Sequence, residues 1–170
     1  MSTPYAELHC LSNFSFQRGA SHPEELVEQA AAFGYAAIAL TDECSLAGIV
    51  RAHRALQALP AERRPKLIIG SELQLANGPC IVLLACNRQG YAQLSRLITR
   101  ARRAADKGRY RLERTMLDDA CADCCALLIP PPDFAQQAES EHIALTLEAD
   151  ALWLGQLFPA RAWMAVTVML

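Results

Sequence analysis

The chain of 170 residues lacks several features that would place a protein in a class at once. Its net charge of −2 gives no global attraction to nucleic acid or to an anionic membrane. The start, MSTPYAELHC, has no basic segment followed by a long apolar run, so we expect no secretory signal. Charged residues interrupt the apolar stripes, which excludes an obvious membrane span. We therefore predict a soluble, cytoplasmic protein that forms one domain over residues 1–170.

Common catalytic and nucleotide-binding motifs are absent too. No GxGxxG follows a strand, and neither GxxxxGK[ST] nor GxSxG occurs, so nothing supports a nucleotide phosphate site or a serine hydrolase. The seven cysteines are an odd number without a secretory signal, which predicts reduced thiols rather than a disulfide framework. Cys121 and Cys124 form a lone CxxC, and a structural zinc site would need a second pair of ligands.

Apolar runs of strand length alternate with amphipathic segments along the chain. Such alternation favours an α/β barrel or a doubly wound sheet. We expect one helix to begin at Ser21, with Glu24 completing a capping box, and another to begin at Ser45. A turn is expected at Asn77-Gly78. The predicted strands are 5–11, 36–41, 66–70, 80–86, 126–129 and 161–170, and the predicted helices follow Ser21, Ser45, Asn87 and Asp133, with a short one within 106–120.

The stretch Ala6 to Ser21, AELHCLSNFSFQRGAS, places His9 where the first strand ends. Asp42 and Glu43 follow the second predicted strand, and Glu72 comes just past the end of the third. Side chains at the carboxyl ends of strands converge on one rim in α/β folds. The pattern therefore predicts that these residues lie close together.

Four blocks in order, LHCLSNFSFQRGASHPEELVEQA, ALTDECSLAG, LIIGSEL and VLLACNRQGYAQLSRLI, carry a family resemblance. They resemble the N-terminal PHP (polymerase and histidinol phosphatase) domain of bacterial DNA polymerase III α-type subunits, and most of all the error-prone class. The resemblance implies a distorted, TIM-like β/α barrel whose rim can hold a metal cluster for phosphoester hydrolysis. It also implies that the barrel is incomplete on its C-terminal side.

The metal-binding pattern of that family is degenerate in this sequence. The His-x-His element reads His9-Cys10-Leu11, and a ligand position that is usually Asp falls at Arg18. The Thr-Asp-His block ends in Glu43 instead of His, the Gly-x-Glu block keeps Glu72, and a further His position falls at Cys80. His9, Glu43 and Glu72 remain as metal candidates. We expect no resident cofactor, and the alternative is a single weakly held Zn, Mn or Mg ion, with Arg18 otherwise filling the site as an ion pair.

The resemblance and the charge distribution together give one leading hypothesis and two alternatives. The first is a non-catalytic module of a translesion, damage-tolerance DNA polymerase, which supports the rest of the polymerase chain or docks another replication protein. The second is a metal-dependent phosphoesterase or 3′–5′ exonuclease.

The third hypothesis is a DNA contact through the segment 96–114. This segment holds eight of the sixteen basic residues, among them Arg100, Arg102 and Arg103. A solvated helix face explains the same pattern, because few aromatic residues lie between the charged ones. An open barrel would also expose strand edges, so self-association is expected unless another chain covers them.

Overall fold

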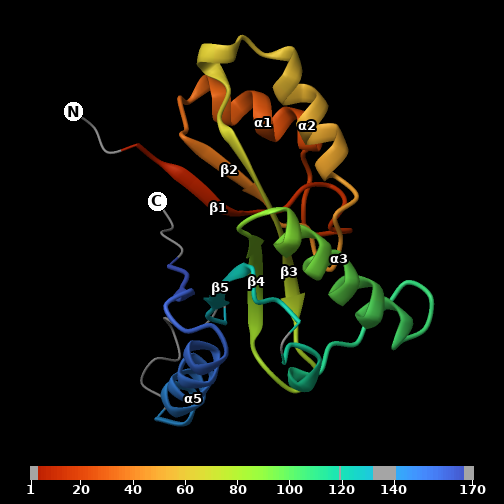
Figure 1. The fold of residues 1–170 in the computed structure, drawn as a ribbon, viewed down its shortest axis with the longest axis vertical. Helices are drawn as coiled ribbons and strands as arrows, with labels where there is room; N and C mark the ends of the chain where they lie inside the picture. Colours follow the sequence, from red (N-terminus) through yellow and green to blue (C-terminus); the bar gives the residue numbers. More distant parts are fainter. Residues whose placement is uncertain (1–3, 119, 132–140, 167–170) are drawn as a thin grey trace. The chain divides into compact units, whose positions relative to one another are not determined.

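The computed structural model describes residues 4–118, 120–131 and 141–166. The chain divides into two compact units, residues 1–72 and residues 73–170 (Figure 1). The predicted order of strands and helices is confirmed by the order of the observed elements. Strand β3, Lys66–Gln74, begins in the first unit and ends in the second.

The first unit is a parallel β-sheet with two helices. Its strands are hydrogen-bonded in the order β1-β2-β3, and each pair is parallel. All four residues of β2 are buried, as expected for a strand covered on both faces. The two helices pack against each other, and their apolar faces form one core with β2. The elements are β1 Ala6–Cys10, α1 Pro23–Ala32, β2 Ala37–Leu40, α2 Ile49–Ala58 and the short 3-10 helix Ala61–Arg63.

Both predicted helix starts in this unit are wrong. Helix α1 is capped at His22, one residue later than predicted, and the Glu25 carboxylate accepts a hydrogen bond of 2.7 Å from the His22 backbone N–H. Pro23 takes the first helical position, where its missing N–H costs nothing. Helix α2 begins at Ile49 instead of Ser45, because the Ser45 hydroxyl accepts from the Ala47 N–H and stabilises a local turn.

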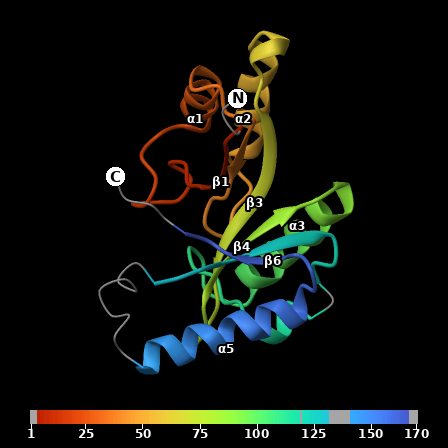
Figure 2. The ribbon, with the colours of Figure 1, turned by 90° about the vertical axis from the view of Figure 1, so that its left-hand side faces the viewer.

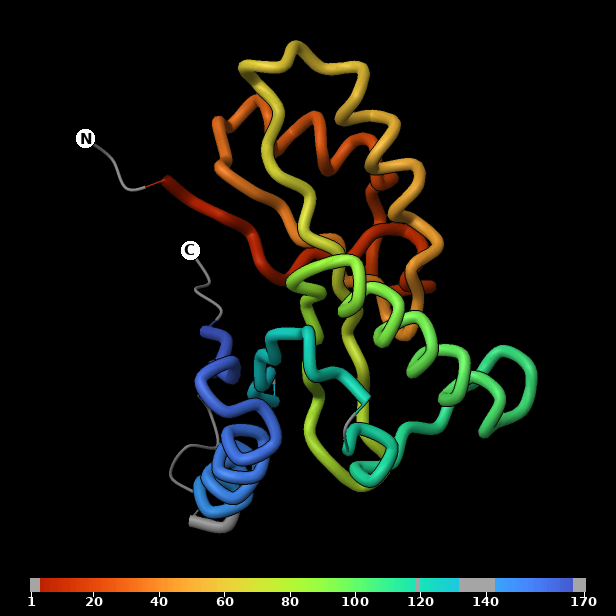
Figure 3. The backbone as a smooth tube through the Cα atoms, in the orientation of Figure 1, coloured from red at the N-terminus to blue at the C-terminus, as the bar shows by residue number. Residues whose placement is uncertain are grey.

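The loop between β1 and α1 folds back tightly on itself, and its path can be followed in Figure 3. The Ser15 carbonyl accepts hydrogen bonds from the backbone N–H groups of Arg18 and Gly19, each 3.0 Å long. Any Cβ at Gly19 would lie 2.0 Å from the Ser12 carbonyl oxygen, so only glycine allows this approach. Gly19 therefore fixes the backbone position from which the side chain of the neighbouring Arg18 extends.

The second unit combines an antiparallel and a parallel strand pair. Strand β4 pairs with β5 in antiparallel register, and β5 pairs with β6 in parallel register. The predicted turn is confirmed, since Asn77 has a φ of 54° and the Gly78 N–H donates to the Leu75 carbonyl. Helix α3 packs against β4 and β5, and α5 packs against β5 and β6 (Figure 2). The elements are β4 Cys80–Ala85, α3 Arg88–Arg103, the 3-10 helix Arg114–Met116, β5 Cys124–Ile129, α5 Glu141–Leu157 and β6 Ala162–Met164.

Helix α3 is capped at Asn87, as predicted, and the Asn87 side chain accepts from the Gly90 N–H at 2.9 Å. The last strand, β6, is shorter than predicted: it begins at Ala162 and ends at Met164. Residues 167–170 of the predicted strand lie outside the described residues. The predicted helix from Asp133 is described from Glu141 onward. No helix among the described residues is both long and apolar enough to cross a membrane.

Candidate functional site

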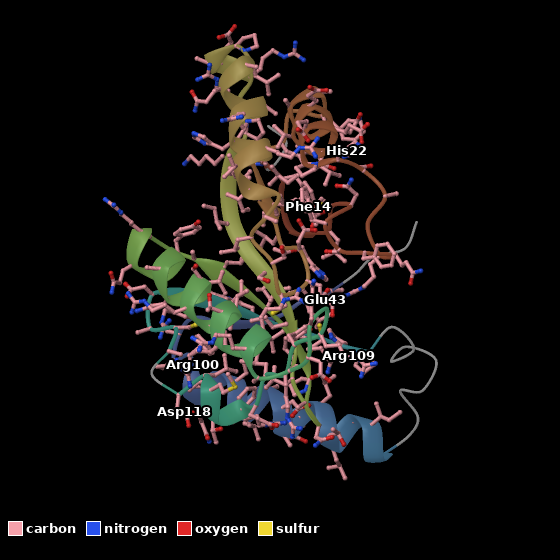
Figure 4. The ribbon with its side chains drawn as sticks, turned by 90° about the vertical axis from the view of Figure 1, so that its right-hand side faces the viewer. Phe14, His22, Glu43, Arg100, Arg109 and Asp118 are labelled. Carbon is pink, nitrogen blue, oxygen red and sulfur yellow. The ribbon has the colours of Figure 1, made fainter. Side chains whose placement is uncertain are left out.

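The predicted convergence of polar side chains occurs within the first unit. Strand β1 supplies His9, the segment after β2 supplies Asp42 and Glu43, and β3 supplies Glu72. Glu72 lies inside β3 and not past its end as predicted, because the strand continues to Gln74. Glu43 and Glu72 face each other as an isolated parallel bridge, and Figure 4 labels Glu43 at this place.

Asp42 organises the loop that follows β1. Its carboxylate is buried and accepts three hydrogen bonds, from the Ser12 N–H at 2.8 Å, the Ser12 hydroxyl at 2.7 Å and the Ser15 hydroxyl at 2.7 Å. A buried carboxylate is tolerated when its oxygens are satisfied in this way. The Ser15 oxygen in turn accepts from the Glu43 N–H at 2.9 Å. Asp42 therefore fixes the loop through one backbone N–H and two hydroxyl donors.

Arg18 lies between two carboxylates at the open side of the site. Its guanidinium donates to both oxygens of Glu72, through Nη1 to Oε1 and through Nη2 to Oε2, the second at 3.2 Å. Nη1 also lies 3.3 Å from Oε2 of Glu43. On the other side, His9 Nε2 lies 2.7 Å from Oε2 of Glu72. The Glu72 carboxylate is thus held by an arginine and a histidine together.

Burial differs sharply between the partners. The side chain of Glu72 is 3% exposed, whereas that of Arg18 is 44% exposed. Burial alone would raise the pKa of Glu72, but the hydrogen bonds from His9 and Arg18 outweigh it and lower that pKa below its ordinary value. The hydrogen bond to Glu72 raises the pKa of Arg18, although partial burial opposes this. Glu72 is therefore a buried anion with a cation bound to it.

The donor set at this site does not fit the metal cluster that the resemblance implies. Both oxygens of Glu72 already accept from N–H groups, and a guanidinium cannot lose its proton to become a ligand. Leu11 offers no donor atom, and Cys80 belongs to β4 in the second unit. Within residues 4–118, 120–131 and 141–166, no three or more His, Cys, Asp or Glu side chains are arranged to hold a metal ion.

Sequence reasoning missed the two serines that bind Asp42. Ser12 and Ser15 are both fully buried, with exposed fractions of 0% and 1%. A signal was present, since two serines in a short loop next to a strand-end aspartate are typical of side-chain to backbone hydrogen bonding. No pattern in the sequence alone indicates which carboxylate they bind.

The predicted nucleic-acid residues lie on the second unit. Arg100, Arg102 and Arg103 are exposed in the last turn of α3, where Figure 4 labels Arg100. Arg102 lies over the ring of Tyr110, with its guanidinium carbon 5.3 Å from the ring centre. Arg114, at the end of the basic segment, instead forms an ion pair with Asp150 of α5 and lies over Trp153. The segment is thus partly a structural contact and partly an exposed charged surface.

Comparison with known proteins identifies relatives along most of the chain. The error-prone DNA polymerase of Aromatoleum aromaticum is 57% identical over 162 residues, which are 95% of this chain and 14% of that protein. The error-prone DNA polymerase of Pseudomonas aeruginosa is 51% identical over 162 residues, with the same two shares. The chain therefore spans about one seventh of the length of these curated relatives.

The fold has a counterpart among solved structures. A Bifidobacterium adolescentis protein classed provisionally as a metal-dependent phosphoesterase superposes with a TM-score of 0.59 at 14% identity, over 88% of this chain and 75% of that one. At this identity the likeness shows a shared α/β fold and nothing about activity. The PHP domain model matches residues 7–157. The chain thus belongs to the PHP domain family, and within that family it is similar to error-prone DNA polymerases.

Proposed function

We propose that this chain is a metal-free PHP module of an error-prone DNA polymerase, which supports the polymerase body or docks another replication protein. The observation that carries the proposal is the guanidinium of Arg18, which binds Glu72 and lies close to Glu43. A fixed positive charge occupies the place where the family's pattern would put a metal ligand. Translesion synthesis, a cytoplasmic location and contact with DNA through the parent polymerase belong to the same proposal.

The physical case is one of charge compensation. Two carboxylates side by side repel each other unless a cation lies between them, and a metal ion is the usual cation in this family. Here the cation is part of the chain, and removing it would leave the buried Glu72 without its arginine partner. A metal ion on Glu43 and Glu72 would have to displace Arg18 first. The alternative, a metal-dependent phosphoesterase or exonuclease, would therefore need a metal site that lacks several of the family's ligands and already holds the guanidinium of Arg18.

Metal analysis tests the proposal directly. We expect purified chain, after incubation with Zn, Mn or Mg and desalting, to retain less than stoichiometric metal by elemental analysis. We also expect no hydrolysis of bis-p-nitrophenyl phosphate above a buffer blank, and no change on His9→Ala. Stoichiometric metal, together with phosphoesterase activity that His9→Ala removes, would overturn the metal-free reading.

The dependence of stability on pH gives a second test. The pKa of Glu72 is lowered in the folded chain, so its ionisation stabilises the fold above the unfolded value of about 4.3, and this contribution is lost as the pH falls through the folded value. We expect Glu72→Gln to cost about 1–3 kcal/mol of unfolding free energy at pH 7, measured by urea denaturation. The difference from wild type should shrink below about pH 4.

A matched control separates this buried pair from ordinary surface pairs. Glu113 forms an exposed ion pair with Arg111, so Glu113→Gln should change the free energy of unfolding very little at any pH. Among the described residues, the titratable groups next to Glu72 are Arg18, His9 and its bridge partner Glu43. An equal loss for Glu72→Gln at pH 7 and pH 3 would show that the ionised form of Glu72 is not what stabilises the unit.

Direct DNA contact through α3 is the second candidate function, favoured by the exposure of Arg100, Arg102 and Arg103. A solvated helix face accounts for the same exposure, so we expect the isolated chain to bind single-stranded DNA no more weakly when all three become Ala. Fluorescence anisotropy at several salt concentrations measures this. A DNA contact would instead show a loss of affinity and a salt slope shallower by about 2, since each neutralised phosphate of a single strand contributes about 0.7.

The control for that experiment removes the same charge elsewhere. Arg54, Arg63 and Lys66 are exposed in the first unit, and their joint replacement by Ala lowers the net charge equally. If both triple variants lose affinity alike, the binding reflects overall charge and the α3 surface is not a specific contact.

Self-association is the remaining proposed property. Among the described residues β1 is hydrogen-bonded along one side to β2, and Tyr5 and Leu8 are 52% and 39% exposed. An unpaired strand edge with apolar neighbours invites pairing with another chain. We expect light scattering to show a weight-average mass above the 18.6 kDa monomer that rises with concentration. A constant monomeric mass in dilute and concentrated samples would contradict this.

A further inference from the structure

Two thiols lie in contact at the end of the strand pair β4 and β5, away from any residue used above. The sulfur of Cys86 is 3.4 Å from the sulfur of Cys125. The sulfurs must approach by about 1.4 Å more to reach the bond length of a disulfide.

Strand register explains why these two side chains meet. Leu84 is the partner of Cys125 across the antiparallel pair, so both side chains point to the same face of the sheet. Cys86 follows Leu84 by two residues and therefore shares that face. The Cys86 backbone N–H donates to the Asp123 carbonyl at 3.0 Å, which holds the chain end of β4 against β5. The contact is thus built into the register of the sheet.

The next thiols in the sequence are engaged elsewhere. Cys124 is the partner of Ala85 and so points to the opposite face, where it is buried and its sulfur donates to the Gly90 carbonyl at 3.6 Å. Cys121 is buried too, and its hydrogen bond with Cys124 raises the pKa of Cys124. The two pairs, Cys86 with Cys125 and Cys121 with Cys124, are therefore separate.

The members of the first pair differ in access. Cys86 is exposed, whereas Cys125 is partly buried. Burial, reinforced by the hydrogen bond with Cys86, raises the pKa of Cys125 to about 11, although the positive charge of Arg161 opposes this. An oxidant from solution reaches Cys86 first, and Cys125 is the thiol that lies beside it.

We propose that Cys86 and Cys125 form a reversible oxidation site, in which a peroxide converts the thiol pair into a cross-strand disulfide. Hydrogen peroxide or an alkyl hydroperoxide serves as the oxidant, and a dithiol reductant reverses the reaction. Disulfides of intracellular proteins are typically of this transient, responsive kind. The inference concerns the second unit and does not rest on the proposed metal-free role of the first.

The chemistry balances in two steps. The Cys86 thiolate attacks one peroxide oxygen, so that an S–O bond forms, the O–O bond breaks, and the departing hydroxide takes up the proton released by Cys86 to become water. Cys86 is then a sulfenic acid. Next the Cys125 sulfur attacks the Cys86 sulfur, the S–S bond forms, the S–O bond breaks, and the second hydroxide leaves as water with the Cys125 proton. Two thiols have lost two electrons to one peroxide.

The test treats the reduced native chain with hydrogen peroxide, blocks free thiols and maps disulfides by mass spectrometry of unreduced peptides. We expect the peptide pair joined by Cys86 and Cys125, and a fall in free thiols from seven to five that dithiothreitol restores. In Cys125→Ser the sulfenic acid on Cys86 should persist and be trapped by dimedone. In Cys86→Ser neither the disulfide nor the trapped adduct on that position should form.

Two comparisons make the result specific to the fold. Cys80→Ser removes a thiol from the other end of β4 and should leave the disulfide unchanged. In urea the chain should instead form bonds between near neighbours such as Cys121 and Cys124, because short loops close at lower entropic cost. A native chain that joins Cys121 to Cys124 and leaves Cys86 and Cys125 reduced would overturn the proposal, as would an identical pattern in urea.

Discussion

The arrangement of the first unit depends on the hydrogen bonds that the buried carboxylate of Asp42 accepts. This carboxylate binds Ser12 and Ser15, and these serines fold the loop that carries Arg18. These hydrogen bonds hold the loop against the segment that follows β2. The close approach at Gly19 is a second constraint on the same loop, since no side chain fits there. Asp42 therefore helps to position a cation through the loop that carries it, by way of Ser12 and Ser15.

If the chain is metal-free, as we propose, this arrangement explains how the site remains stable although ligands of the family's metal pattern are replaced. Losing a metal ion from a cluster of carboxylates leaves repulsion and buried charge, both of which destabilise a fold. Arg18 supplies a compensating charge, and His9 keeps a hydrogen bond to Glu72. The identities above 50% to error-prone DNA polymerases extend over nearly the whole chain, so the loop and its cation belong to a domain that is well matched to these relatives over its length.

Much of the fold follows from the sequence, and the failures have local causes. The order of strands and helices was predictable because buried strands read as continuous apolar runs and helices as amphipathic ones. The Asn77-Gly78 turn was predictable because few residue pairs adopt that backbone. The predicted start at Ser21 was wrong by one residue, because the adjacent His22 is the cap. The predicted start at Ser45 was wrong because the Ser45 hydroxyl binds the Ala47 N–H in a local turn and the helix begins only after Gly48. The antiparallel pairing of β4 with β5 depends on long-range packing and has no local signal.

The candidate site was predictable in its members and only partly in its bonding. Neighbouring parallel strands bring His9, Glu43 and Glu72 together, and the resemblance identified Arg18 as a replaced position of the same site. The buried serines that bind Asp42, and the continuation of β3 through Glu72, required the structure because they depend on contacts between residues far apart in the chain.

The guanidinium of Arg18 has one further consequence. A metal ion is an exchangeable component, whose occupancy depends on its free concentration and on competing chelators. A cation joined to the backbone is present at a fixed stoichiometry as soon as the chain is synthesised. In the metal-free module that we propose, the charge balance around Glu72 would therefore be inherited with the polypeptide and would not vary with the metal supply of the cell.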